Sequence, residues 1–351
     1  MYKVIIVDDE PIIVEGLKLG IEWANWNCEI AGTASNGLAG LELMRKIKPD
    51  ILISDISMNN MDGLAMVAAI KSEYPDIEVC LLTGFRNFEY AQQAIKLDNN
   101  DVHKGSLILV NKAYPSYVDG EDAVSLYDYK TNTYTVADTN VMINKSIVDT
   151  TNKMFDDFYS IYGESDLYIA CAYRSYATQE GLYQDELNSD PEAGVNLVAP
   201  PGYSDHQTGY VFDVDHYNAT EKNGIAFDGT GNDEWFLNNC ANYGFIVRYP
   251  EDKVDITGYY YEPWHYRYVG IPHAIYMKQN NLCLEEYLDK IKNNTKDNPL
   301  TVSAEDGTTW SMWYEKAYED GDVTQIAIPK DCDYEISGNN VDGFIITVKS
   351  K

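Results

Sequence analysis

Apolar and polar residues alternate differently in the two parts of this chain, which meet near residue 100. In the first part, short apolar runs take turns with stretches of helical periodicity. Such apolar runs are typical of strands buried on both faces of a parallel sheet. The pattern predicts strands at 3–9, 28–34, 50–55 and 78–84 and helices at 11–23, 38–47, 64–74 and 88–97. Four strand–helix units in succession predict an α/β fold with a doubly wound sheet.

The second part has no strand–helix rhythm and mixes short strands, turns and helices. This mixture favours an α+β domain around an antiparallel sheet. From residue 298 onward, alternating apolar positions are separated by Asp-Gly turns, which predicts a small β-rich tail. The pattern predicts a helix at 138–162, capped by Asp138 or Thr139, and strands at 107–112, 166–173, 209–215 and 244–250. We therefore expect a domain at 1–100, a second at 101–297 and the tail at 298–351.

Composition and charge change at the same place. Residues 1–100 hold only three of the 29 tyrosines, and their 15 acidic and 8 basic side chains give a net charge of −7. The whole chain carries −30, which leaves −23 on the remainder. So large a negative charge argues against nucleic acid as a partner, because a phosphate backbone would be repelled.

Two further features bound the compartment. No apolar run reaches the roughly 20 residues of a membrane span, and the N-terminus lacks the basic start and apolar stretch of a secretory signal. The chain as written is therefore expected to be soluble and cytoplasmic. Its six cysteines form no CxxC pair, which argues against a cysteine zinc cluster or a dense disulfide framework. Cys28 and Cys80 are expected in the core, and a Cys240–Cys283 disulfide is left open for an oxidising compartment.

Acidic residues gather where the predicted parallel strands end. Asp8 and Asp9 end the first strand, Asp55 ends the third, and Thr83 lies at the end of the fourth. Carboxylates at one sheet edge repel each other and bind hard cations, so we expect an Mg²⁺ site here. A merely solvated acidic rim is the alternative.

The first part resembles a bacterial response-regulator receiver domain, which has a flavodoxin-like sheet. The resemblance rests on VDDE (7–10), SDISMNNMDG (54–63) and LLTGF (81–85). It implies that Asp55 accepts a phosphoryl group from a sensor histidine kinase, that Asp8 and Asp9 bind Mg²⁺, and that Thr83 contacts the phosphoryl group. Asn59 stands where the family usually has proline.

This resemblance stops before the family pattern is complete. Receivers continue into a fifth strand that ends in a Lys-Pro pair, and then into a fifth helix. Lys104 lacks the following proline, and no such helix follows it. We therefore expect a truncated receiver that does not control the second part; a phosphorylation-regulated signalling protein is the alternative.

Polar motifs in the second part predict a metal hydrolase. A catalytic zinc site needs three N or O ligands and a nearby carboxylate base. His206, Asp213 and His265 supply the candidate ligands, and Glu262 the base. Asp215 would share a strand face with Asp213, which leaves open whether it ligates or orients a ligand. The other three histidines, His103, His216 and His273, are expected to be surface or core residues.

These motifs resemble the VanY-type zinc D-alanyl-D-alanine carboxypeptidases and their dipeptidase relatives. The family pattern SxHxxGxAxD is met by residues 204–213, with Val211 in place of alanine, and the pattern ExWH by residues 262–265. AYRSYATQ (172–179) matches the family's YRSxxxQ segment. The resemblance covers roughly 106–292 and implies a zinc carboxypeptidase that trims peptidoglycan stem peptides. Its relatives often act outside the membrane.

Roles follow for the remaining site residues. Glu262 would take a proton from water and return it to the leaving amine. Arg174 would stabilise the oxyanion or bind a substrate carboxylate. Ser204 and Gln179 are candidate hydrogen-bond donors to the peptide, and Trp264 and residues 259–261 would wall the cleft. D-Ala-D-Ala ends are the expected substrate, with L,D-carboxypeptidase action on tetrapeptide stems as the alternative.

Overall fold

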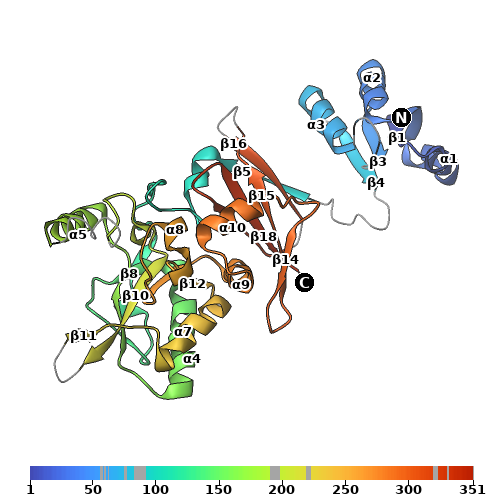
Figure 1. The fold of residues 1–351 in the computed structure, drawn as a ribbon. Coiled ribbons are helices and arrows are strands. Elements are labelled where there is room, and N and C mark those ends of the chain that lie inside the picture. The colour runs from blue at the N-terminus through green and yellow to red at the C-terminus, as the bar shows by residue number, and fades with distance from the viewer. Residues whose placement is uncertain are drawn as a thin grey trace. The chain divides into compact units, whose positions relative to one another are not determined.

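The computed structural model divides into two compact units, residues 1–93 and 94–351 (Figure 1). Their positions relative to one another are not determined, so each unit is described by itself. The structure describes all residues except 56–57, 59–60, 62, 75–76, 83–91, 190–197, 219–222, 319–322, 330–331 and 351. No helix among the described residues is both long and apolar enough to cross a membrane.

The first unit has a parallel sheet of four strands in the order β2-β1-β3-β4. Strand β1 lies inside this sheet, and Val4–Val7 are fully buried there, as the uninterrupted apolar run predicts. The elements are β1 (Tyr2–Val7), α1 (Pro11–Gly20), β2 (Cys28–Ala34), α2 (Gly37–Ile47), β3 (Ile51–Asp55), α3 (Gly63–Glu73) and β4 (Glu78–Leu82). The predicted α/β sheet is therefore confirmed.

The second unit is built around a mostly antiparallel sheet in the order β12-β13-β10-β9-β7, with β11 paired to β10. Helix α4 (Val148–Tyr162) buries Phe155 and Phe158 in a core shared with this sheet. The strands are β7 (Thr135–Val136), β9 (Leu167–Cys171), β10 (Val211–Asn218), β11 (Asn223–Ile225), β12 (Phe245–Val247) and β13 (His265–Tyr268). The predicted α+β fold is confirmed.

Shorter elements surround this sheet. Two strands, β6 (Ala123–Ser125) and β8 (Met142–Asn144), form a separate antiparallel pair. The helices are α5 (Tyr176–Ser189), α7 (Glu234–Asn239), α8 (Val254–Thr257), α9 (Ile271–Gln279) and α10 (Leu284–Ile291), with 3-10 turns η3 (Asn99–His103) and η6 (Asp205–Thr208) among others.

The C-terminal residues form a second antiparallel sheet in the order β14-β15-β18-β17. One of its faces shares a core with α9 and α10, and the other shares a core with the paired strands β5 and β16. These strands are β5 (Gln92–Asp98), β14 (Leu300–Ser303), β15 (Thr309–Lys316), β16 (Val323–Pro329), β17 (Tyr334–Gly338) and β18 (Gly343–Lys349).

The helix predicted at 88–97 is wrong. Residues 88–91 lie outside the described part, and 92–98 form strand β5, which pairs with β16. Ile95 and Leu97 pack into the core beside Ile326 and Ile328, while Lys96 between them is exposed. Alternate burial is the period of a strand, so these residues serve the second unit's sheet instead of a receiver helix.

The strand predicted at 107–112 is also absent. Leu107, Ile108, Leu109 and Val110 are buried, but the segment has no ladder of backbone bonds and forms only an isolated bridge from Asn111 to Tyr114. Arginine side chains bind its carbonyl oxygens: Arg267 donates to those of Ser106 and Ile108, and Arg248 to that of Val110. Arginine side chains here donate the hydrogen bonds that the backbone of a neighbouring strand would otherwise give.

The helix predicted at 138–162 begins ten residues late, at Val148. Asp138 accepts a bond from the backbone of Asn140 in a local turn, so neither it nor Thr139 caps the helix. Met142–Asn144 then pair with β6. Among the cysteines, Cys28 is buried as predicted but Cys80 is exposed on β4, and Cys240 and Cys283 are buried free thiols.

The assignment of β5 can be tested by mutation. Because Ile95 and Leu97 are only partly buried, the double change Ile95→Ala and Leu97→Ala should cost roughly 1–2 kcal/mol per site in unfolding free energy. Amide hydrogen exchange should rise in β16 and stay unchanged in β1–β4. Lys96→Ala, on the exposed side of the strand, is the matched control. Faster exchange in β1–β4 with β16 unaffected would return these residues to the first unit.

Candidate functional site

Three of the predicted metal ligands meet at the centre of the second unit's sheet. Asp213 on β10 lies directly opposite His265 on β13 in the antiparallel register of the two strands. His206 stands on η6, the turn that leads into β10. Facing residues on one side of an antiparallel pair have their side chains close together, so the strand register itself brings two of the candidates together.

Two distances in this group match the spacing of ligand atoms around one cation. Asp213 Oδ2 lies 3.3 Å from Nε2 of His206, and Asp213 Oδ1 lies 3.2 Å from Nδ1 of His265. Four-coordinate zinc with bonds of about 2.1 Å separates adjacent ligand atoms by roughly 3.4 Å. Asp213 Oδ1 is buried and forms no hydrogen bond. The two histidines are each 3% exposed.

Each histidine is oriented from behind. Nδ1 of His206 lies 2.6 Å from the carbonyl oxygen of Ala172, and Nε2 of His265 lies 3.3 Å from Oδ2 of Asp205. A hydrogen bond on one ring nitrogen fixes the tautomer and leaves the other nitrogen as a ligand. In both rings the nitrogen that remains faces Asp213.

A buried ion network supports Asp205. Arg248 Nε lies 3.8 Å and Arg267 Nη1 lies 3.9 Å from its Oδ2, and both arginines are fully buried. Arg248 also forms two hydrogen bonds of 2.9 and 2.7 Å to Glu285 on α10. Burial opposes the charge on Asp205, but His265 and the two arginines hold the pKa of its carboxyl well below the usual range.

Glu262 completes the group on the side of the cleft. Its Oε2 lies 3.1 Å from Nδ1 of His265, the same nitrogen that Asp213 Oδ1 approaches. Its backbone N–H donates to the carbonyl of Tyr249, which fixes the loop before β13. The side chain lines the cavity described below, as a base acting on a bound water requires.

Arg174 is held by two neighbours. Its Nη1 donates to Gln179 Oε1 at 2.9 Å, and its Nη2 donates to Cys171 Sγ at 3.3 Å. Gln179 is fully buried, and its amide nitrogen donates to the carbonyl of Ala199. The amide of Gln179 is therefore bonded through both its oxygen and its nitrogen and holds Arg174 in place. Gln179 also lines the cavity described below, and its contact with a peptide stays a prediction.

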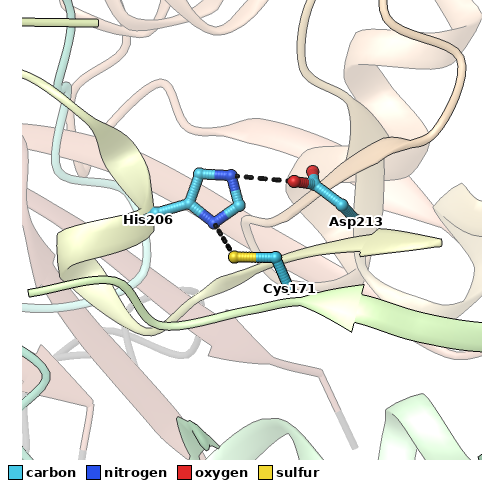
Figure 2. A group of neighbouring side chains, drawn as sticks. All are labelled: Cys171, His206 and Asp213. Carbon is cyan, nitrogen blue, oxygen red and sulfur yellow. Dashed lines mark hydrogen bonds and ion pairs between the residues drawn. The ribbon is translucent and has the colours of Figure 1, made fainter. Parts of the chain in front are cut away.

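Cys171 is the site residue that sequence reasoning missed. Figure 2 shows the His206 imidazole between the Cys171 thiol and the Asp213 carboxylate. The sulfur lies 3.9 Å from Nδ1 of His206, and Cys171 on β9 is the register partner of Asp213. Burial opposes ionisation of the thiol, yet His206 and Arg174 lower its pKa. Its position inside the predicted strand 166–173, three residues before Arg174, was the available signal.

A cavity of about 430 Å³ opens onto these residues. Ser204, Tyr259 and Trp264 line it, whereas Tyr260 and Tyr261 are absent from its described wall. Helix α5 contributes Leu182, Asp185 and Glu186 to the lining. Arg174 is the one cationic Arg or Lys side chain among the described lining residues.

Comparison with known proteins decides the family. The family profile of D-alanyl-D-alanine carboxypeptidase (VanY) matches residues 140–271, within which all the candidate ligands fall. A D-alanyl-D-alanine carboxypeptidase of Enterococcus faecium is 37% identical over 256 residues, which cover 72% of this chain and 78% of the relative. The chain belongs to the VanY family.

Other relatives agree with this assignment. The bifunctional D-Ala-D-Ala dipeptidase and carboxypeptidase VanXYC of Enterococcus gallinarum is 40% identical over 129 residues, or 36% of this chain and 68% of that protein. The solved D,D-dipeptidase VanXYg, in complex with a D-Ala-D-Ala phosphinate analogue, superposes with a TM-score of 0.64 at 30% identity. The match covers 74% of this chain and 99% of that structure. These matches confirm the predicted metallopeptidase of the carboxypeptidase type.

The first unit is a receiver domain. The response regulator receiver profile matches residues 4–104. The transcriptional regulatory protein YesN of Bacillus subtilis is 38% identical over 96 residues, which are 27% of this chain and 26% of YesN. The predicted fusion of a receiver with a VanY-type peptidase is confirmed.

Charge in the VanY-type site is arranged around one carboxylate. Burial opposes protonation of both histidines; even so, Asp213 and Cys171 raise the pKa of His206 to about 9, and Asp205 and Asp213 raise that of His265. Despite burial, the same histidines hold the pKa of Asp213 far below its usual range. The site therefore stabilises a compact group of positive charge around an ionised aspartate.

The other polar candidates of the VanY-type unit lie elsewhere. Asp215 accepts a bond from the backbone of Phe227 at 3.3 Å and so anchors that loop. His216 is bound between Asp166 and Asp233. His273 is buried between Tyr287 and Thr347, and His103 contacts Asn340.

The receiver's acidic residues also converge. One carboxylate oxygen from each of Asp8, Asp9 and Asp55 lies within 4.8 Å of the other two. Burial raises the pKa of Asp8, and the nearby charges of Asp55 and Asp9 add to this. Such mutual repulsion is what a divalent cation relieves. Thr83 lies outside the described residues.

Proposed function

We propose that the second unit is a zinc-dependent carboxypeptidase that removes a C-terminal D-amino acid from peptidoglycan stem peptides. The observation that carries this proposal is the arrangement around Asp213. Two histidines, each oriented through its other ring nitrogen, direct a nitrogen at the two oxygens of one partly buried carboxylate beside an open cavity. The names of the family's members supply the substrate class.

The residues present fit zinc. His206, Asp213 and His265 would hold it, because Asp213 Oδ1 is buried without a hydrogen bond and all three donors are nitrogen or oxygen. Bound zinc polarises a scissile carbonyl and lowers the pKa of a coordinated water toward about 7.

Glu262 is the proposed general base. Its carboxylate faces the cavity beside His265, where it would accept a proton from the attacking water. The same carboxyl would then return the proton to the leaving amine, which completes the acid–base cycle.

Arg174 would set the requirement for a free C-terminus. Its guanidinium is held in place by Gln179 and Cys171, so little side-chain freedom is lost when it binds an anion. A carboxylate entering the cavity finds this cation in a wall that also carries acidic residues of α5. Ser204 and Trp264, at the wall of the same cavity, would contact the peptide.

In the receiver, we propose that Asp8 and Asp9 bind Mg²⁺ and that Asp55 accepts a phosphoryl group from a histidine kinase. The convergence of the three carboxylates supports this. A role for Thr83 stays a prediction.

The carboxypeptidase mechanism is tested at Glu262. Glu262→Ala should retain zinc and lose at least about two orders of magnitude in turnover, the range for a positioned acid–base group. His206→Ala should instead lose zinc, measured by metal analysis of the purified protein. His216→Ala, a histidine outside the site, is the control for zinc content. Equal turnover by wild type and Glu262→Ala would remove Glu262 from the mechanism.

Specificity is tested with stem peptides of two lengths. A pentapeptide stem that ends in D-Ala-D-Ala should be cut faster than a tetrapeptide stem, and an amidated pentapeptide should resist cleavage because it offers Arg174 no carboxylate. Products are separated by chromatography and identified by mass. Preference for the tetrapeptide would establish L,D-carboxypeptidase action, and internal cleavage of the amidated peptide would contradict both versions.

Regulation is tested with a phosphoryl donor. Acetyl phosphate with Mg²⁺ should leave peptidase turnover unchanged, because residues 92–98 form a strand of the second unit and not a receiver helix. Asp55→Ala is the control. A several-fold change that disappears in Asp55→Ala would make the chain a regulated enzyme instead.

A further inference from the structure

The hydroxyl of Tyr259 is a polar group whose partner is missing. The side chain is 1% exposed, and its oxygen has no hydrogen-bond partner among the described residues. Buried tyrosine hydroxyls are normally paired. Two others in this unit follow the rule: Tyr134 donates to Asn152 at 2.7 Å, and Tyr287 lies 2.5 Å from a nitrogen of His273.

Tyr259 differs from these residues in its position, because it lines the cavity that also exposes Glu262 and Arg174. Its backbone follows the short helix α8, where Thr257 Oγ1 accepts a bond from its N–H. Buried polar groups that lack an internal partner next to a cavity are candidates for binding what enters it.

The ring of Tyr259 is firmly held. Its centroid lies 4.7 Å from that of Tyr249 at an angle of 44°, and the ammonium of Lys112 lies 4.6 Å from the ring centroid. Lys112 also donates to the carbonyl of Gly258 at 2.7 Å. These contacts fix the ring and leave the hydroxyl unused, which is the arrangement of a preorganised donor.

We propose that the Tyr259 hydroxyl donates a hydrogen bond to an oxygen of the peptide bound in the cavity. The inference rests on the proposed function, because it takes the occupant to be the carboxypeptidase substrate. A phenol is a donor, and peptide carbonyl and carboxylate oxygens are acceptors, so the two chemistries match. Burial raises the pKa of Tyr259, so the phenol keeps its proton over the working pH range.

Tyr266 offers a matched control. Its hydroxyl is also buried without a partner, but the ring lies in the apolar core beside Phe212 and Phe236, and it is not among the described lining residues of the cavity. Tyr259→Phe therefore removes a hydroxyl from the cavity wall, and Tyr266→Phe removes the same group from the apolar core. Neither change breaks an internal hydrogen bond, so both variants should melt at or above the wild-type temperature.

The experiment compares these variants in the full chain with zinc bound. With a D-Ala-D-Ala-ending pentapeptide, Tyr259→Phe should lower kcat/KM about tenfold, equal to about 1.4 kcal/mol, with zinc content unchanged. Tyr266→Phe should match wild type. The Kd for the same peptide, measured by calorimetry in a Glu262→Ala background, should also rise when Tyr259→Phe is added.

Three results would overturn the inference: an unchanged kcat/KM in Tyr259→Phe, an equal loss in Tyr266→Phe, or a lowered melting temperature that accounts for the loss. Failure of the proposed function is a separate outcome, because wild type itself would then neither cleave nor bind the peptide.

Discussion

The second unit depends on one buried ionic network. Asp205, Arg248 and Arg267 are almost entirely removed from solvent, and Glu285 from α10 neutralises the second arginine charge. Burying charges is expensive unless each has a partner. Loss of Asp205 would take away the carboxylate beside Arg267, and loss of Arg248 would take away the cation beside Glu285. Asp205 also contacts Nε2 of His265. The buried charges that hold Asp205 in place therefore also orient this candidate metal ligand.

The same arginines also organise the backbone. They donate to carbonyls at positions 106, 108 and 110, which lets an apolar segment run through the interior without a strand partner. Helix α10, the β10–β13 pair and this segment are thus fixed by the same charges. A site built on such a network is rigid before a substrate arrives, as positioning of a metal and a base requires.

Much of this could be predicted from the sequence, for a physical reason. Local chemistry defines the motifs around His206, Asp213 and His265, and strand alternation places the side chains of the last two. The distant residues that compete to pair with a segment could not be read from the sequence. Residues 92–98 have a period compatible with either element until β16 supplies a partner, and 107–112 look like a strand until arginine side chains take its carbonyls. Cys171 and Gln179 acquire their neighbours only through the β9–β10 register and the fold of α5.

Competition for residues 92–98 also bears on whether the receiver could act on the second unit through them. A receiver transmits its state through a bistable element that phosphorylation biases. Strand β5 instead has its apolar residues Ile95 and Leu97 packed, partly buried, against a core of the second unit that includes Ile326, Ile328 and Phe344. Releasing it to act as a receiver helix would expose that core and break its pairing with β16. The free energy that keeps the peptidase sheet closed therefore opposes any conformational change that the receiver would need in order to signal through these residues.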